Sequence, residues 1–166
     1  MKLKNLLIII VIIALGVFLI VAKSSNKDTV INFEHDDITE EDLLLYNYLL
    51  EQEGHLYIDG EGNIFNAALQ DTKAVVFDLN GDSVPELLGY NTSTVYCGGG
   101  AQGCALYILQ LKDGKWVNIN NGGFFPQMGL VALHKKENGY KKIIVPRLLG
   151  KNGLLVFNGK IYDFVK

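Results

Sequence analysis

The spacing of apolar and polar residues divides the chain into three kinds of segment. From Leu6 to Ala22, 17 residues run without a charged or strongly polar side chain. From 39 to 53, apolar residues recur at helical spacing, and Gly54 interrupts them. After Gly54 the pattern changes to short runs rich in Val, Ile, Tyr and Phe, which is typical of strands. The pattern therefore predicts an apolar leader, one helix and a β-rich remainder.

The expected helix begins at Thr39 and ends at Gly54, a length of about four turns. Thr39 can cap its first turn, and the acidic residues that follow suit the positive end of the helix dipole. Leu43, Tyr46 and Leu50 fall on one stripe of such a helix. We expect this stripe to pack on the β-rich part, which makes the helix amphipathic.

Turn dipeptides separate the predicted strands. Asn-Gly and Asp-Gly adopt the positive φ that tight hairpins need. They occur at Asp59-Gly60, Asn80-Gly81, Asp113-Gly114, Asn121-Gly122, Asn138-Gly139, Asn152-Gly153 and Asn158-Gly159. The predicted strands are 56–59, 74–78, 86–91, 105–111, 116–119, 130–134, 141–145, 154–157 and 161–165. With no second helical pattern, the fold is expected to be mainly β, an antiparallel meander or sandwich with one N-terminal helix packed on it.

One predicted strand differs from the others in its pattern. Leu106 and Ile108 alternate with Tyr107 and Leu109, so apolar side chains point to both faces of the strand. A strand of this kind is covered on both sides. We therefore expect a layer of structure on each face of the sheet at this strand.

Composition and charge narrow the class of protein. The chain has 166 residues, of which 49% are hydrophobic and 20% charged, which fits one globular domain. The net charge is −3, whereas nucleic-acid-binding domains usually carry an excess of basic residues, so we expect no nucleic-acid partner. Residues 28–86 hold fifteen acidic side chains and one basic, whereas residues 87–166 hold three acidic and ten basic. Such asymmetry fits either a mixed solvated surface or a partner-binding face.

The apolar leader predicts the location. As a helix, Leu6–Ala22 would be about 25 Å long, near the lower limit for crossing a membrane. It is longer than a usual signal-peptide core, and Ala22-Lys23-Ser24 is a poor cleavage signal. We expect residues 1–24 to be a membrane anchor or signal segment, with an uncleaved anchor favoured, residues 25–38 a tether, and residues 39–166 one extracytoplasmic domain.

These segments imply a single-pass protein of the bacterial inner membrane, attached through residues 6–22. Its C-terminal domain would lie in the periplasm or at the cell exterior, and a cleaved leader would make the protein secreted. The chain has two cysteines, Cys97 and Cys104, separated by six residues in the sequence CGGGAQGC. An even count in an exported domain predicts a disulfide, and the glycines permit the reversal it needs. The alternative is two free thiols in a reducing cytosol.

One loop between two predicted strands carries candidate chemistry. Asp78, Asn80, Asp82 and Glu86 stand at its first, third, fifth and ninth positions, and Val84 at the seventh can offer its backbone carbonyl. Hard cations such as Ca²⁺ take six to eight oxygen ligands, and this spacing wraps oxygens around one point. The same residue types also form Asx-turns without a metal. Both interpretations are open at this stage.

The segment DLNGDSVPELL resembles the calcium loop of integrin-type FG-GAP and VCBS repeats, whose pattern is D-x-[DN]-x-D-G-x-x-[DE] between two strands. The resemblance implies Ca²⁺ held by the four acidic and amide side chains, with a stiffening role. Ser83 stands where the pattern has Gly, so we expect strain at that turn. The loop differs from a helix-loop-helix site, because Gly89 stands where that site needs a bidentate Glu. The wider stretch 74–166 resembles small exported bacterial proteins of unassigned function.

We therefore expect a non-catalytic, membrane-tethered extracytoplasmic module that binds a protein or a cell-envelope partner. Inhibitor or immunity roles against an envelope-attacking enzyme fall within this class. The alternative is an envelope hydrolase that uses Asp82 and Glu86, which would need a cleft and a carboxylate of raised pKa. Trp116, Phe124 and Phe125 are candidates either for a sugar-binding surface or for the core.

Overall fold

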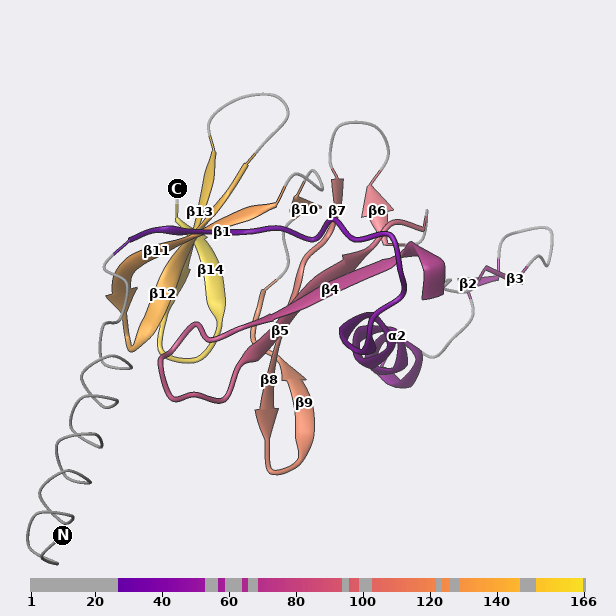
Figure 1. Ribbon diagram of the computed structural model, residues 1–166, viewed down its shortest axis with the longest axis horizontal. Coiled ribbons are helices and arrows are strands. Elements are labelled where there is room, and N and C mark those ends of the chain that lie inside the picture. The colour runs from indigo at the N-terminus through magenta and orange to yellow at the C-terminus, as the bar shows by residue number, and fades with distance from the viewer. Residues whose placement is uncertain are drawn as a thin grey trace, which may run out of the picture.

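The computed structural model describes residues 27–52, 57–58, 64–65, 69–93, 96–98, 103–121, 124–125, 129–146 and 152–165. These residues form one α-helix, α2 (Glu40–Gln52), a short 3₁₀ turn, η1 (Leu69–Asp71), and strands (Figure 1). The strands are β1 (Thr29–Ile31), β2 (Tyr57–Ile58), β3 (Ile64–Phe65), β4 (Thr72–Phe77), β5 (Glu86–Asn91), β6 (Cys97–Gly98), β7 (Gly103–Ala105), β8 (Tyr107–Lys112), β9 (Lys115–Asn118), β10 (Phe124–Phe125), β11 (Leu130–Glu137), β12 (Tyr140–Val145), β13 (Gly153–Phe157) and β14 (Tyr162–Val165).

Two larger sheets make up most of the structure. One has five strands in the order β1-β11-β12-β13-β14, and the other has four in the order β4-β5-β8-β9. A small sheet, β10-β7-β6, and the hairpin β2-β3 accompany them. All the pairs formed by these strands are antiparallel, which confirms a mainly β, antiparallel fold with one helix. The run from β11 to β14 is a meander.

The main core lies between the two larger sheets. The four-stranded sheet contributes Leu88 and Ile108, and the five-stranded sheet contributes Leu130, Ile143 and Leu155. All five side chains are buried, so apolar surface from each sheet is removed from water against the other. Of the two predicted arrangements, meander and sandwich, the structure therefore contains both.

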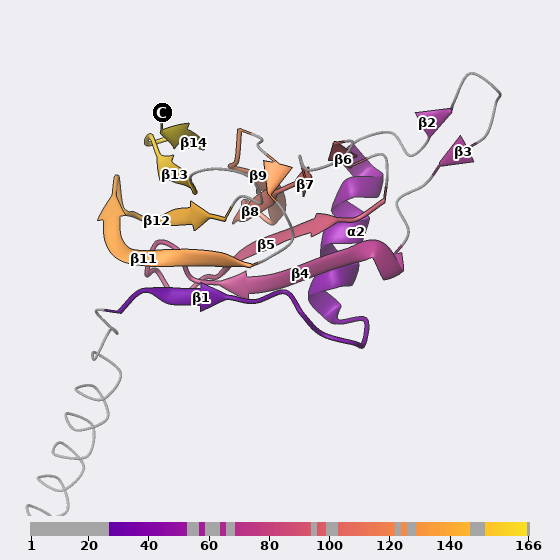
Figure 2. The same cartoon turned by 90° about the horizontal axis from the view of Figure 1, so that it is seen from above.

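The helix covers the opposite face of the four-stranded sheet (Figures 1 and 2). Leu45 and Leu49 of α2 pack with Leu87 of β5 and with Tyr107 and Leu109 of β8. Of the alternating side chains, Tyr107 and Leu109 therefore face α2, whereas Leu106 and Ile108 face the sandwich core. This confirms the prediction of a strand covered on both faces. Strand β5 is covered in the same way, because all six of its residues are buried.

The buried stripe of α2 differs from the predicted one. Leu45 and Leu49 face the sheet, whereas Leu43 is 45% exposed and so does not anchor the helix. The prediction of Leu43, Tyr46 and Leu50 was therefore shifted by one position. A run of consecutive leucines contains a plausible stripe in each phase, so the apolar pattern alone does not select one.

The start of the helix selects the phase. Thr39 Oγ1 accepts a hydrogen bond from the Asp42 N–H at 3.2 Å, and Asp42 Oδ2 accepts one from the Thr39 N–H at 3.0 Å. This reciprocal pair is a capping box. Asp42 Oδ1 also accepts a bond from the Ala74 N–H of β4 at 2.7 Å. Asp42 is therefore a buried link between helix and sheet, which charge patterning at the helix start does not reveal.

Part of the expected tether, 25–38, belongs to the fold. Strand β1 pairs with β11, and Ile31 and Phe33 are buried in the sandwich core while the preceding Val30 is exposed. The alternation covers only a few residues within an acidic stretch, which is why the sequence predicts no strand there. The polar segment that links any leader to the domain is correspondingly shorter.

The predicted turns have mixed outcomes. Asp113-Gly114 and Asn138-Gly139 have positive φ at both residues and connect β8 to β9 and β11 to β12, as expected for tight hairpins. Asn158-Gly159 connects β13 to β14. Asn80-Gly81 instead belongs to a longer loop between β4 and β5. Asp59-Gly60 and Gly122 lie outside the described residues.

The expected anchor, 6–22, also lies outside the described residues. In the part of the chain that the structure covers, no helix combines the length and apolar character that a membrane span needs.

Gly89 fixes how closely α2 approaches the sheet. A Cβ atom at this position would overlap the Lys73 carbonyl oxygen of β4 and would lie 2.6 Å from Leu45 Cδ2 of α2. We expect Gly89→Ala to lower the free energy of unfolding by about 3 kcal/mol, because backbone cannot yield as a side chain can. Chemical denaturation of the full chain measures the change. In the control Gly114→Ala the added Cβ meets open space, so only the positive φ costs about 1 kcal/mol. Equal losses in the two variants would contradict this account.

Candidate functional site

The loop between β4 and β5, residues 78–85, is docked on the five-stranded sheet. Its Leu79 side chain is fully buried in the sandwich core, and the Leu79 carbonyl accepts a hydrogen bond from the Lys141 N–H at 2.8 Å. Lys136 Nζ donates to the Asn80 carbonyl oxygen at 2.6 Å. The Lys141 ammonium lies 4.9 Å from the centre of the Phe77 ring. The loop is therefore held by the β11–β12 hairpin as well as by its own strands.

The first predicted ligand, Asp78, binds the backbone of its own loop. Its Oδ1 accepts a bond from the Gly81 N–H at 2.5 Å, and its Oδ2 accepts one from the Ser83 N–H at 3.2 Å. Ser83 has a φ of 71°, a conformation that favours glycine. This confirms the strain expected where the sequence departs from the calcium-loop pattern.

The next two predicted ligands form Asx-turns. Asn80 Oδ1 accepts a bond from the Asp82 N–H at 2.8 Å, and Asp82 Oδ1 accepts one from the Val84 N–H at 2.7 Å. These bonds shape the loop with no metal. They leave a second lone pair on each of these oxygens, so both interpretations of the sequence stay open.

Glu86, the last predicted side-chain ligand, is buried at the start of β5 and is only 1% exposed. Its Oε2 accepts a bond from the Leu79 N–H at 2.9 Å, and its Oε1 accepts one from Asn80 Nδ2 at 3.2 Å. Burial raises the pKa of Glu86 to about 7, and the nearby charges of Asp82 and Asp78 act in the same direction. The hydrogen bond from Leu79 opposes this rise in pKa without cancelling it.

The amide nitrogen of Asn80 is the point on which the oxygens converge. Besides Glu86, it donates to Asp82 Oδ2 at 2.8 Å and to the Tyr140 hydroxyl at 3.3 Å. Gln110 Nε2 donates to the same hydroxyl. The network thus joins the loop to β8 and to β12, one strand from each larger sheet. The motif gives no signal for Tyr140 or Gln110, because both lie far outside it. Tyr140 is 60 residues after Asn80, and Gln110 is 30 residues before Tyr140.

The hydrogen bonds within the loop involve all four predicted side-chain ligands. Among the described residues, no three His, Cys, Asp or Glu side chains come close enough together to hold a metal ion. The structure places Asp78, Asn80, Asp82 and Glu86 in one loop, and the Asn80 amide nitrogen faces one oxygen each of Asp82 and Glu86. The two oxygens of Asp78 accept bonds from the Gly81 and Ser83 N–H groups instead.

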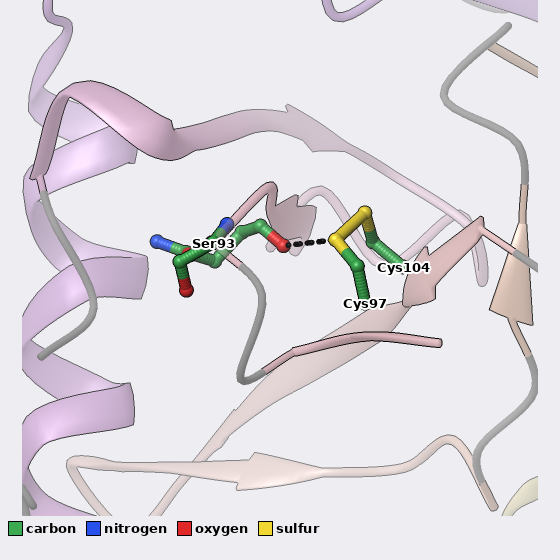
Figure 3. Close-up of a disulfide and its surroundings, with 4 residues drawn as sticks. Ser93, Cys97 and Cys104 are labelled. Carbon is green, nitrogen blue, oxygen red and sulfur yellow. Dashed lines mark hydrogen bonds between the residues drawn. A yellow bond between two sulfur atoms is a disulfide. The ribbon is translucent and has the colours of Figure 1, made fainter. Parts of the chain in front are cut away.

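The predicted disulfide partners lie at bonding distance (Figure 3). Cys97 Sγ is 2.04 Å from Cys104 Sγ, and the two residues are directly opposite in the β6–β7 pair. Cys104 is buried in the sandwich core. The Asn91 carbonyl oxygen at the end of β5 lies 3.3 Å from Cys97 Sγ. The crosslink therefore joins β6 to β7 within the small sheet, next to the end of β5.

The acidic half of the chain divides into two sets. Asp42 and Glu86 are buried and hydrogen-bonded within the fold. Other acids are exposed: Glu34, Asp36 and Asp37 in the connection between β1 and α2, Glu40 and Glu51 on α2, and Asp28 and Asp82 elsewhere. Charge counting along the chain does not separate these sets, because burial depends on the tertiary fold.

A groove separates α2 from β9. It has a volume of about 810 Å³, and one of its walls includes Trp116, which also packs against the helix–sheet core. The lining residues are Leu44, Asn47, Tyr48, Glu51, Gln52, Gly114, Lys115, Trp116, Val117 and Asn118. The predicted core contact of Trp116 is confirmed, and its place in the groove leaves the sugar-binding alternative a prediction. Phe124 and Phe125 form β10, and their side chains lie outside the described part of the chain.

Comparisons of the chain with protein-family models, curated proteins and solved structures found no match. The resemblance of residues 78–86 to FG-GAP and VCBS calcium loops rests on the motif itself and stays a prediction.

Glu86 should make stability depend on pH. Because its folded-state pKa is about 7, above the usual 4.5, the folded protein holds this proton more tightly than the unfolded chain. The stabilisation is fully present below pH 4.5 and is lost as the pH rises through 7. Glu86→Gln lacks this pH-dependent contribution. As the pH increases from 4.5 to 7, the free energy of unfolding of Glu86→Gln relative to wild type should therefore rise, by at most about 1.4 kcal/mol per pH unit. Denaturation of both proteins at about pH 4.5, 6 and 8 measures it, and parallel pH profiles would contradict the expectation.

Proposed function

We propose that the protein is a non-catalytic binding module outside the cytoplasm, tethered to the membrane by its apolar N-terminal segment. The observation that carries this proposal is the Cys97–Cys104 pair at bonding distance. Disulfides persist in oxidising compartments and are rare in the cytosol. The two-sheet body then presents its surfaces to a protein or an envelope partner.

The proposal is tested by locating the C-terminal domain and the state of its thiols. A reporter fused after Lys166 should be active when it requires export and inactive when it requires the cytosol. In protein from the same cells, unfolded in denaturant so that the buried Cys104 is accessible, Cys97 and Cys104 should react with an alkylating agent only after reduction. Activity of a cytosolic reporter together with two freely alkylated thiols would overturn the proposal. In a Cys97→Ser variant, Cys104 should react under the same denaturing conditions without reduction, which shows that the reagent reaches this otherwise buried thiol.

The second candidate, an envelope hydrolase, is favoured by one observation, the raised pKa of Glu86. A general acid requires such a value near neutral pH. Both Glu86 oxygens, however, accept hydrogen bonds inside the fold, and the groove between α2 and β9 is lined by other residues. These contacts support a structural role for Glu86. Turnover of cell-wall material that disappears in Glu86→Gln would instead favour the hydrolase.

As a second part of the proposal, Ca²⁺ stabilises the 78–86 loop. Support comes from the spacing of Asp78, Asp82 and Glu86 and from the strained Ser83, at the position where the calcium-loop pattern has Gly. We expect weak binding, with a Kd on the order of 10⁻³ M as in extracellular modules. The role of the ion would be to stiffen the β4–β5 connection.

Calorimetry of the full chain in detergent tests this part. At about 10 mM Ca²⁺ we expect stabilisation by about 1.4 kcal/mol relative to chelator, which corresponds to a Tm increase of about 4 °C. The increase should vanish in Asp78→Ala and in Asp82→Ala. It should persist in Asp37→Ala, which removes an exposed acid elsewhere. An identical Tm with Ca²⁺ and with chelator would show that the loop works as a metal-free clasp.

A further inference from the structure

Strand β9 is an outer strand of the four-stranded sheet. It pairs with β8 on one side, and among the described strands none pairs with its other side. An unpaired strand edge exposes a row of backbone N–H and C=O groups that can pair with another extended chain. In Figure 1, β9 is the arm of the β8–β9 hairpin nearer to α2.

The pairing register shows which groups point outward. The hairpin closes at Asp113-Gly114, so Lys112 and Lys115 face each other as a hydrogen-bonded pair. In antiparallel ladders such pairs alternate with non-bonded pairs. The bond from the Ile119 N–H to the Ile108 carbonyl, 2.8 Å, fits this alternation. Trp116 and Asn118 therefore direct their N–H and C=O groups away from β8.

The opposite wall of the groove is a second face of α2. Leu44, Asn47, Tyr48, Glu51 and Gln52 line it, and they recur at the spacing of one helical face. This face is adjacent to the one that Leu45 and Leu49 bury against the sheet. Leu44 is 40% exposed, although it lies beside a fully buried leucine.

We propose that this groove binds an extended peptide segment of a partner protein, which adds a strand to the free edge of β9. The outward groups of Trp116 and Asn118 would supply main-chain hydrogen bonds. Alternate side chains of the peptide would lie toward Leu44, Tyr48 and Trp116, so the segment should carry apolar residues at every second position. The groove walls carry Glu51 and Lys115, which have opposite charges, so no strong net charge is required of the segment.

This proposal rests on one part of the proposed function, that the protein is a binding module, and not on its location. The groove shares no residue with the 78–86 loop, and its test does not depend on where the protein resides. Loss of export would therefore refute the proposed location without affecting peptide binding, and absence of peptide binding would leave the location intact.

The experiment selects ligands from a phage library of random peptides, about eight residues long to match an extended segment, with the purified full chain in detergent as bait. Selected peptides should share apolar residues at alternate positions. Leu44→Arg should weaken the binding of a selected synthetic peptide by about tenfold, because it places a charge in the groove. Leu43→Arg is the matched control, since it alters a neighbouring exposed leucine that is not among the lining residues, and it should leave affinity unchanged.

A backbone scan of the selected peptide separates strand addition from side-chain docking. N-methylation removes one main-chain donor at a time, and we expect about tenfold weaker binding at alternate residues only. Equal effects at all residues, or at none, would overturn strand addition. Failure to enrich any peptide on wild type over Leu44→Arg would overturn the peptide proposal. Binding of chitotetraose that Leu44→Arg abolishes would instead assign the groove to a saccharide.

Discussion

The structure depends on burying strand β5 on both of its faces. All six residues of β5 are buried, and they contact the sandwich core, the helix, the polar loop and the disulfide. Leu88 points into the sandwich core and Leu87 toward α2. At the ends of the strand, Glu86 closes the preceding loop, and the Asn91 carbonyl lies against the disulfide. A strand shared by two apolar layers has little freedom to shift register, because a one-residue slip would exchange its faces.

Polar groups join the two sheets where apolar packing ends. Asn80, Tyr140 and Gln110 come from a loop and from one strand of each larger sheet, and they share one hydrogen-bond network. Such a network orients its members only when each is satisfied, and the carboxylates of Asp82 and Glu86 complete it. The role of these acids in the fold is thus to accept hydrogen bonds, whatever further ligand the loop takes.

Local patterns predicted the helix and the longer strands, but they missed β1 and the short strands β3, β6 and β10, and they did not predict which strands pair. The β8 alternation, the Asp113-Gly114 turn and the pairing of Cys97 with Cys104 depend on neighbours in the sequence, and the structure agrees with them. The phase of α2 and the burial of Asp42 depend on contacts with β4, which no window of sequence contains. The same limit applies to the candidate site. Spacing along the chain placed the loop acids together, but it did not indicate that a distant tyrosine and lysine would bind the loop, nor that the Asn80 amide would present its nitrogen to the carboxylates. Orientation of an amide is decided by the surrounding donors and acceptors.

The absence of a side chain at Gly89 has an effect beyond the core. Because Leu45 occupies the space that a Cβ would fill, Gly89 sets the separation between the helix axis and the sheet. The walls of the α2–β9 groove belong to these same two bodies. A larger residue at position 89 would press on Leu45 of α2 and on the backbone of β4 together, so a change inside the core would also act on the helix that forms one wall of the groove.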